Sequence, residues 1–233
     1  MEWNSKIIGN LQWSGEISNI EAKQQVGEKI SAKVKDADVI GVGSGSTVYV
    51  ALFAIAEKIK RNNWNIKVIP TSLEISMACK ALGLPLTSSL QHKPDWLFDG
   101  ADEVDPTHNL IKGRGGAMFQ EKLLMRSSNE NFIIVDQSKM VRQLGERFPI
   151  PIEVFPQALP YVEQQLELLG AGELTLRLAK GKDGPIISEN GNYILDARFE
   201  TIAENLEFNI KSITGVIESG LFQNHQISII SAD

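Results

Sequence analysis

Short apolar runs alternate with longer segments of helical periodicity through the first two thirds of the chain. The runs are DVIGVG, IKVIP, DWLF and FIIVD, and the helical segments around them are IEAKQQVGEKISAKVK, STVYVALFAIAEKIKRN, LEISMACKALGL and GAMFQEKLLMRSS. Strands that alternate with helices predict a parallel sheet joined by right-handed crossovers. A further short strand is expected at LTSSL.

The pattern changes near Gly145, where proline punctuates the segment FPIPIEVFP. We expect strands at PIEVF, LTLRLA, PIISE, NYILD and GVIESGLF, and helices at QALPYVEQQLELLG and ETIAENLEFNIK. With the hairpin at Asn190-Gly191 counted as part of one strand-turn-strand unit, the nearest simple pattern is β-α-β-β-α-β, which is typical of a ferredoxin-like domain. The last run, QISIIS, is expected to return to the first sheet. The sequence therefore predicts an α/β domain interrupted by a small α+β domain.

Composition excludes several classes of protein. The chain has 233 residues, of which 42% are hydrophobic, so it can bury a proper core. Its single cysteine, Cys79, excludes an internal disulfide and fits a helix core position. The histidines have no metal-ligand spacing, so no metal site is expected. A net charge of -6 argues against binding to nucleic acid, and no apolar stretch reaches the ~20 residues that span a bilayer.

Residues 1 to 17 are interpreted as an extension whose Trp3 and Trp13 dock on the rest of the protein. The segment has Glu2 near its start, no basic stretch before its apolar patch and no arginine, so it is unlike a secretory or organelle-targeting peptide. We therefore expect a cytoplasmic protein without membrane association.

Residues able to bind an anion follow the first predicted strand. In open parallel sheets, ligands bind beyond the carboxyl ends of the strands. There the glycines of GVGSGST (residues 41–47) would let backbone N–H groups approach a phosphate, and Ser46 and Thr47 open a helix whose N-terminus favours negative charge. The segment lacks the last glycine of a dinucleotide fingerprint and the lysine of a Walker A loop. A tight strand-to-helix turn that needs glycine for backbone reasons explains it equally well.

Two further segments carry charge near strand ends. DGADEVD (residues 99–105) has four acids, and crowded carboxylates raise one another's pKa, which suits acid–base chemistry. A solvated loop with turn-forming aspartates is the alternative. In LIKGRGGAMFQEK, Lys112 and Arg114 alternate with glycines, and Glu121 follows early in a helix. Glu121 in a partly dry position would be a plausible base, whereas an exposed glutamate that complements the helix dipole is the simpler explanation.

Together these motifs resemble the ribose-5-phosphate isomerases of type A. The resemblance runs from about Glu21 to Phe222 and covers, in the family order, GVGSGST, TSLEISMACKALGLPL, DWLFDGADEVDP, LIKGRGGAMFQEK, VDQSKMVRQLG, FPIPIEVFP, NGNYILD and GVIESGLF. Each motif alone is weak, but the set with its spacing is highly specific. The resemblance implies a Rossmann-like parallel-sheet domain at residues 18–145 plus 223–233, with an inserted ferredoxin-like α+β lid domain at residues 146–222.

The resemblance also implies an activity. This is the interconversion of D-ribose 5-phosphate and D-ribulose 5-phosphate, in the pentose phosphate pathway, through a cis-enediolate and without a metal or organic cofactor. By matching position, Glu121 is the base, and Asp99, Asp102 and Lys112 act on ring opening and on the substrate oxygens. The substrate-binding residues implied are Lys23, Ser44, Gly45, Ser46, Thr47, Asp99, Gly100, Ala101, Asp102, Lys112, Gly113, Arg114, Gly115 and Lys139. Dimers or tetramers are usual in the family, so a homodimer or homotetramer is expected.

The sequence departs from the family pattern at a few positions. Ser44 replaces a threonine that the first loop often has, which keeps the hydroxyl, and Arg114 stands where many members have glycine. Sugar-phosphate deaminases and CoA transferases share this kind of sheet, but DGAD together with KGRG favours the isomerase. A non-catalytic sugar-phosphate sensor is the alternative from another class. Such sensors usually carry a basic DNA-binding helix-turn-helix, and the sequence shows no such module.

Overall fold

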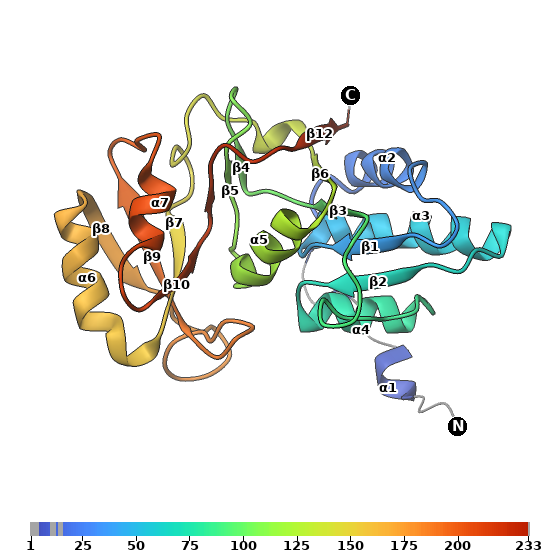
Figure 1. The fold of residues 1–233 in the computed structure, drawn as a ribbon, viewed down its shortest axis with the longest axis horizontal. Helices are drawn as coiled ribbons and strands as arrows, with labels where there is room; N and C mark the ends of the chain where they lie inside the picture. Colours follow the sequence, from blue (N-terminus) through green and yellow to red (C-terminus); the bar gives the residue numbers. More distant parts are fainter. Residues whose placement is uncertain (1–4, 10–12, 14–15, 233) are drawn as a thin grey trace. The chain divides into compact units, whose positions relative to one another are not determined.

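The computed structural model describes residues 5–9, 13 and 16–232 (Figure 1). The chain divides into two compact units. The first contains residues up to Gly100, Leu123–Ser138 and the segment from Gln226, and the second contains Ala101–Lys122 and Lys139–His225. Residues 101–122, 139–145 and 223–225 thus lie in the second unit, whereas the family resemblance places them in the Rossmann-like domain. The domain boundaries expected from the family fold, residues 18–145 plus 223–233 and residues 146–222, remain a prediction.

A five-stranded parallel sheet forms the centre of the first unit (Figure 1). The strands lie in the order β2 (Lys67–Pro70), β1 (Val39–Val42), β3 (Trp96–Asp99), β6 (Glu130–Val135) and β12 (Ser228–Ser231), and every neighbouring pair is parallel. Numbered along the chain, this is the order 2-1-3-4-5 of flavodoxin-like doubly wound folds. The predicted parallel sheet is therefore confirmed, including the return of the last run to it.

Helices α2 (Ile20–Ser31), α3 (Ser46–Asn62) and α4 (Leu73–Ala81) pack with this sheet, and α1 (Lys6–Gly9) precedes them. Ile30 and Ile55 are buried in one core with Phe98 of β3. Helix α2 approaches α3 closely because Gly27 has no side chain: a Cβ there would lie 3.0 Å from the Cα of Ala51. The predicted helices are thus confirmed, and apolar packing rather than helix propensity alone holds them on the sheet.

The sequence also made predictions about two tryptophans, Trp3 and Trp13, and about Cys79. The Trp13 ring lies 5.1 Å from that of Tyr49, whereas Trp3 falls outside the described residues. Cys79 is fully buried in α4, and burial raises the pKa of its thiol to about 12, so its predicted core position is confirmed.

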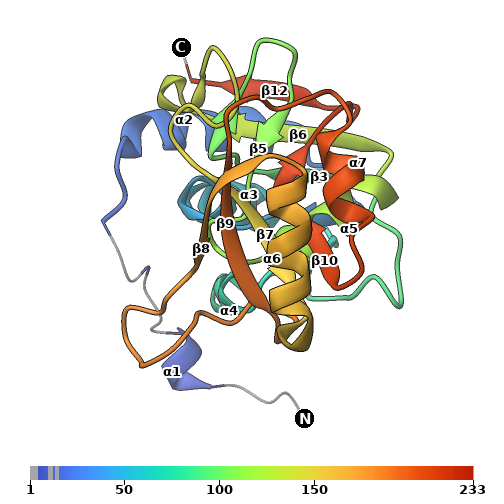
Figure 2. The same ribbon diagram turned by 90° about the vertical axis from the view of Figure 1, so that its left-hand side faces the viewer.

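The second unit contains a four-stranded antiparallel sheet with the order β10 (Val216–Ser219), β7 (Ile150–Val154), β9 (Tyr193–Phe199), β8 (Ala171–Leu176). Helices α6 (Leu159–Leu168) and α7 (Leu206–Lys211) cover one face of it (Figure 2). Val162, Leu166 and Ile210 of these helices share a buried core with Ile152 and Leu195 of the strands. Along the chain the elements run β-α-β-β-α-β, which confirms the predicted ferredoxin-like domain.

The remaining elements belong to the second unit or, like η1 and α5, continue from one unit into the other along the chain. A three-stranded sheet has the order β11 (Leu221–Phe222), β5 (Leu110–Ile111), β4 (Glu103–Val104), and 3₁₀ turns lie at η1 (Gln137–Lys139) and η2 (Pro156–Ala158). Helix α5 (Met118–Ser127) spans the division between the two units. No helix within the described ranges is long and apolar enough to cross a membrane.

Four predicted elements differ from the structure. The single strand expected at GVIESGLF is divided into β10 and β11, which belong to different sheets. LTSSL makes only an isolated bridge through Leu86, because the chain turns at Ser88, whose carbonyl accepts the N–H groups of residues 91 and 92. PIISE also makes only isolated bridges, one through Pro185 to Leu178 and one through Ile187 to Tyr193. The helix expected from Glu200 begins at Leu206.

Candidate functional site

The carboxyl ends of β1 and β3 form a topological switch point in the first unit. The two strands are neighbours in the sheet, although β2 lies between them in the sequence. The chain therefore leaves β1 toward one side and reaches β3 on the other, and open α/β sheets bind ligands where this happens. The predicted anion-binding turn follows β1, and Asp99 ends β3.

Asp99 holds the start of this turn. Its side chain is fully buried, and its Oδ1 accepts hydrogen bonds from the N–H of Ser44 at 3.1 Å and of Gly100 at 2.7 Å. A Cβ at Gly43 would lie 2.0 Å from the Asp99 carboxyl, so only glycine allows this approach. The structure thus brings together the turn and the aspartate, which lie more than fifty residues apart in sequence.

A hydroxyl and a lysine support the rest of the turn. Ser44 Oγ lies 2.8 Å from Oγ1 of Thr71, which follows β2, and the buried Lys23 of α2 donates to Ser46 Oγ at 3.0 Å. Gly45 has a φ of 102°, which favours glycine, and α3 begins at the next residue with Thr47 in its first turn. A helix N-terminus beside a buried lysine attracts an anion such as a phosphate.

Lys112 and Glu121 form a buried ion pair in the second unit. Lys112 Nζ lies 3.4 Å from Glu121 Oε2, and the two side chains are 3% and 5% exposed. Lys112 follows β5, and Glu121 lies in the first turn of α5. The burial excludes the exposed helix-start glutamate that the residues alone allowed. A carboxylate and an ammonium in contact away from water can move a proton and stabilise the negative charge that results.

The glycine-rich loop at residues 112–116, which includes Gly115, is fixed through its backbone. The Arg114 N–H donates to Asp102 Oδ2 at 3.3 Å. Arg177 donates to the carbonyl oxygens of Gly113 at 3.1 Å and Arg114 at 2.9 Å. Arg177 also donates from Nε to Asp196 Oδ2 at 2.8 Å. Sequence reasoning missed Arg177, because nothing in LTLRLAK marks it as a partner of this loop.

Asp102 has a perturbed carboxyl. Removal of water by the surrounding protein raises its pKa above the ordinary value, while the positive charges of Lys112, Arg114 and Lys139 oppose this rise. Lys139 is the last residue of η1. Three of the predicted substrate-binding cations therefore surround one predicted catalytic carboxyl. An aspartate with a raised pKa can hold a proton closer to neutral pH, which suits proton transfer between oxygens.

The remaining acids of DGADEVD are structural. Asp105 accepts hydrogen bonds from the backbone and side chains of Thr107 and Asn109, as expected for a turn former. Glu103 is fully buried and accepts from three backbone N–H groups, at residues 145, 147 and 148. Gly100 and Ala101 connect Asp99 to Asp102. In the part of the chain that the structure describes, no group of three or more His, Cys, Asp or Glu residues could hold a metal ion.

The fold and these residues define a doubly wound α/β protein with a ferredoxin-like insertion, an anion-binding turn and a buried lysine–glutamate pair. The family model of ribose 5-phosphate isomerase A (phosphoriboisomerase A) matches residues 67–233. Ribose-5-phosphate isomerase A of Methanocaldococcus jannaschii is 42% identical over 209 residues, which cover 88% of this chain and 92% of the relative. The protein of that name from Archaeoglobus fulgidus is 41% identical over 203 residues, or 85% of this chain and 89% of the relative.

Solved structures of ribose 5-phosphate isomerases have a fold similar to that of this chain. The structure of ribose 5-phosphate isomerase A from Methanocaldococcus jannaschii has a TM-score of 0.89 and 37% identity, covering 93% of this chain and 96% of that one. A D-ribose-5-phosphate isomerase in complex with phospho-erythronic acid has a TM-score of 0.87 and 35% identity, covering 94% and 96%. This chain belongs to the ribose 5-phosphate isomerase A family.

Proposed function

We propose that this protein interconverts D-ribose 5-phosphate and D-ribulose 5-phosphate as an intramolecular isomerase of the pentose phosphate pathway. Family membership supports the substrate class. The observation that carries the chemistry is the buried ion pair of Lys112 and Glu121. Lys112, in the loop before α5, has its Nζ 3.4 Å from Oε2 of Glu121, which lies in the first turn of α5. An aldose–ketose isomerisation needs one base for a carbon-bound proton and one cation for a developing oxyanion, and this pair supplies both.

We assign the phosphate of the open-chain sugar to the turn at residues 44–47 with Lys23. The backbone N–H groups at the start of α3 and the buried lysine both favour negative charge. Binding energy from the phosphate fixes the distant end of the substrate, which orients the reacting carbons without taking part in the reaction. Gly100, Ala101, Gly113, Arg114, Gly115 and Lys139 are proposed to complete the substrate contacts.

The chemical step moves protons only. Glu121 takes the proton from C2 of the aldose, and the electron pair of that C–H bond forms the C1=C2 double bond as the carbonyl O1 becomes an oxyanion. Lys112 stabilises this oxyanion of the cis-enediolate. The same carboxyl then returns the proton to C1, while O2 loses its proton and becomes the ketone oxygen. Reactant and product are isomers, so no oxidant or reductant is needed.

Asp102 is the better candidate for moving the oxygen-bound proton from O2 to O1. Its raised pKa allows it to carry a proton, whereas Asp99 Oδ1 is already engaged by two backbone N–H groups. Asp99 is proposed to hold the turn and to assist ring opening. We further propose that the enzyme needs no metal and acts in the cytoplasm as a homodimer or homotetramer.

The test is a direct assay with D-ribose 5-phosphate, following formation of the ketopentose phosphate, in the presence of EDTA. We expect turnover by the wild-type protein and a loss of about 10²–10⁴-fold in Glu121→Gln, since a positioned base contributes that much. The exposed Glu163 of α6 offers a matched control, and Glu163→Gln should keep full activity.

Three outcomes would count against the proposal. Binding without turnover by the wild type would indicate a sensor rather than an enzyme. Loss of activity in EDTA that a divalent ion restores would overturn metal independence. Full turnover by Glu121→Gln would remove this residue from the mechanism.

A further inference from the structure

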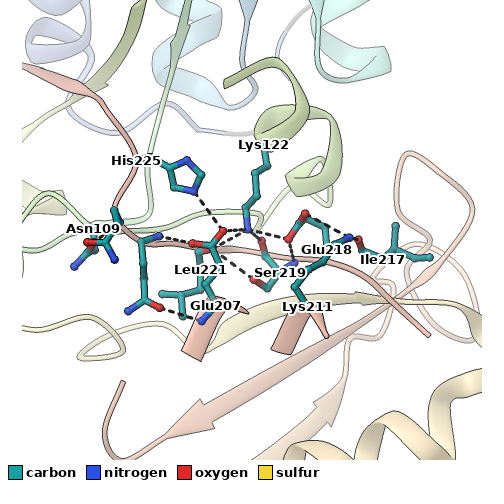
Figure 3. Close-up of polar contacts among 11 residues, drawn as sticks. Asn109, Lys122, Glu207, Lys211, Ile217, Glu218, Ser219, Leu221 and His225 are labelled. Carbon is teal, nitrogen blue, oxygen red and sulfur yellow. Dashed lines mark hydrogen bonds and ion pairs between the residues drawn. The ribbon is translucent and has the colours of Figure 1, made fainter. Parts of the chain in front are cut away.

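Lys122, the residue after Glu121, lies in a buried polar cluster that the proposed mechanism leaves unused (Figure 3). Its side chain extends from α5 to four acceptors. Lys122 Nζ lies 2.9 Å from Glu207 Oε1 and 2.9 Å from Glu218 Oε1. It also donates to the carbonyl oxygens of Ser219 at 2.9 Å and Leu221 at 2.8 Å. The side chain is 2% exposed, so protein atoms replace water around the ammonium group.

The cluster holds its charges in fixed positions. Burial alone would raise the pKa of Glu207, but the hydrogen bond with His225 and the charge of Lys122 lower it to about 2. Glu207 is therefore ionised at neutral pH, and so the lysine faces carboxylates from α7 and β10. Lys211 reaches Glu218 Oε2 at 3.6 Å from the solvent side. Removing one partner of a buried ion pair leaves an uncompensated charge, so these contacts resist displacement.

One short segment, residues 218–221, contacts both Lys122 and the backbone of Lys112. Gly220 lies between the two carbonyls that accept from Lys122, and its own carbonyl accepts the N–H of Lys112 at 2.8 Å. A Cβ at Gly220 would lie 2.1 Å from the Lys112 carbonyl oxygen, so the two backbones touch. This segment thus fixes Lys112 through its backbone, and it fixes α5 through Lys122, the residue after Glu121.

Successive residues of an α-helix point about 100° apart, so neighbours on α5 reach different surroundings. Glu121 reaches Lys112, while Lys122 reaches the cluster. We propose that Lys122 is a positioning residue: by binding residues 218–221 it sets the placement of the Glu121 carboxyl relative to the Lys112 ammonium. The inference rests on the proposed function, in which Glu121 is the base.

The first test compares two lysines that pair with the same glutamate. Lys122→Met should lower kcat by about 10²-fold with little change in KM, because a misplacement of about 1 Å at a reacting group has that effect while phosphate binding is retained. Lys211→Met is the matched control, since Lys211 pairs with Glu218 but lies on α7. It should keep kcat near the wild-type value. Lys122→Arg, which retains the charge and the donors, should recover part of the loss.

A charge-matched variant separates positioning from folding. In the wild type, Lys122 and its two carboxylate partners sum to one net negative charge, and Lys122→Met/Glu218→Gln, which keeps only the Glu207 carboxylate, also leaves one. We expect this double variant to melt closer to the wild type than Lys122→Met does, yet to keep the low kcat. It decides the question if Lys122→Met does not fold.

Two results would overturn the inference. One is equal kcat in Lys122→Met and Lys211→Met. The other is full recovery of kcat in the double variant, since that would make charge balance the whole role of Lys122. Neither result touches the proposed function, which fails instead if the wild-type protein does not isomerise the substrate or if Glu121→Gln does so normally.

Discussion

Replacing Lys112 by methionine separates the catalytic role of the buried pair from its effect on stability. At an effective dielectric constant of about 20, two unit charges 3.4 Å apart attract by about 5 kcal/mol, before the cost of desolvating both groups. Breaking a buried pair by removing one partner costs about 3–5 kcal/mol, because the other charge is left in the interior. Loss of one oxyanion donor costs a further ~2.7–4 kcal/mol in the transition state, or about 10²–10³-fold in kcat.

The assay measures urea unfolding and steady-state kinetics for Lys112→Met and for Lys112→Met/Glu121→Gln. The single variant should lose several kcal/mol of unfolding free energy, within the ~3–5 kcal/mol of a broken buried pair. The double variant should recover most of this loss, because it removes the unpaired carboxylate, but it should remain inactive. A double variant as unstable as the single one would refute the pairing argument. An unchanged kcat in the single variant would refute the role of Lys112.

Three further predictions follow from particular contacts. Gly43→Ala should destabilise the fold by about 1–3 kcal/mol in urea unfolding and lower kcat/KM, because its Cβ would meet a carboxyl 2.0 Å away. The exposed Gly172, with open space around it, is the control. Arg177→Met should lower kcat/KM about tenfold or more by releasing two loop carbonyls, whereas the more exposed Arg198→Met should not. The pKa of Glu207 lies below its ordinary 4.5, at about 2, so its stabilising contribution is present above pH 4.5 and is lost as pH falls toward 2. The unfolding free energies of wild type and Glu207→Gln should therefore converge in that range, and a constant difference would contradict the assignment.

Much of the fold could be predicted because its signals are local. The run STVYVALFAIAEKIKRN corresponds to α3 residue for residue, since its glycine turn and its apolar periodicity are both visible in the sequence. The two-residue strands β4, β5 and β11 are too short to show a period, so their sheet was not predicted. The strand expected at PIISE is a different case: an apolar run with β-branched residues satisfies the pattern of a strand, but only Pro185 and Ile187 form bridges to neighbouring segments.

The candidate site likewise has residues that could be predicted from the sequence and supporting contacts that could not. Glu121, Lys112 and the residues of the anion-binding turn stand out because they follow strand ends or glycine-rich loops. Their supporting contacts could not be predicted, because they join distant parts of the chain. Ser44 and Thr71 are separated by 27 residues, and Lys122 and Glu218 by 96. No local pattern marks such a pair, and burial of the lysine appears only once the second unit has folded.

The most direct test of the account follows hydrogen exchange at carbon in D₂O. If Glu121 carries the proton between C1 and C2, the wild-type enzyme should place solvent deuterium on these carbons in those turnovers in which the protonated carboxyl exchanges with D₂O, as detected by NMR. Glu121→Gln should neither isomerise the sugar phosphate nor label it. Labelling by Glu121→Gln at the wild-type rate would show that another group is the base.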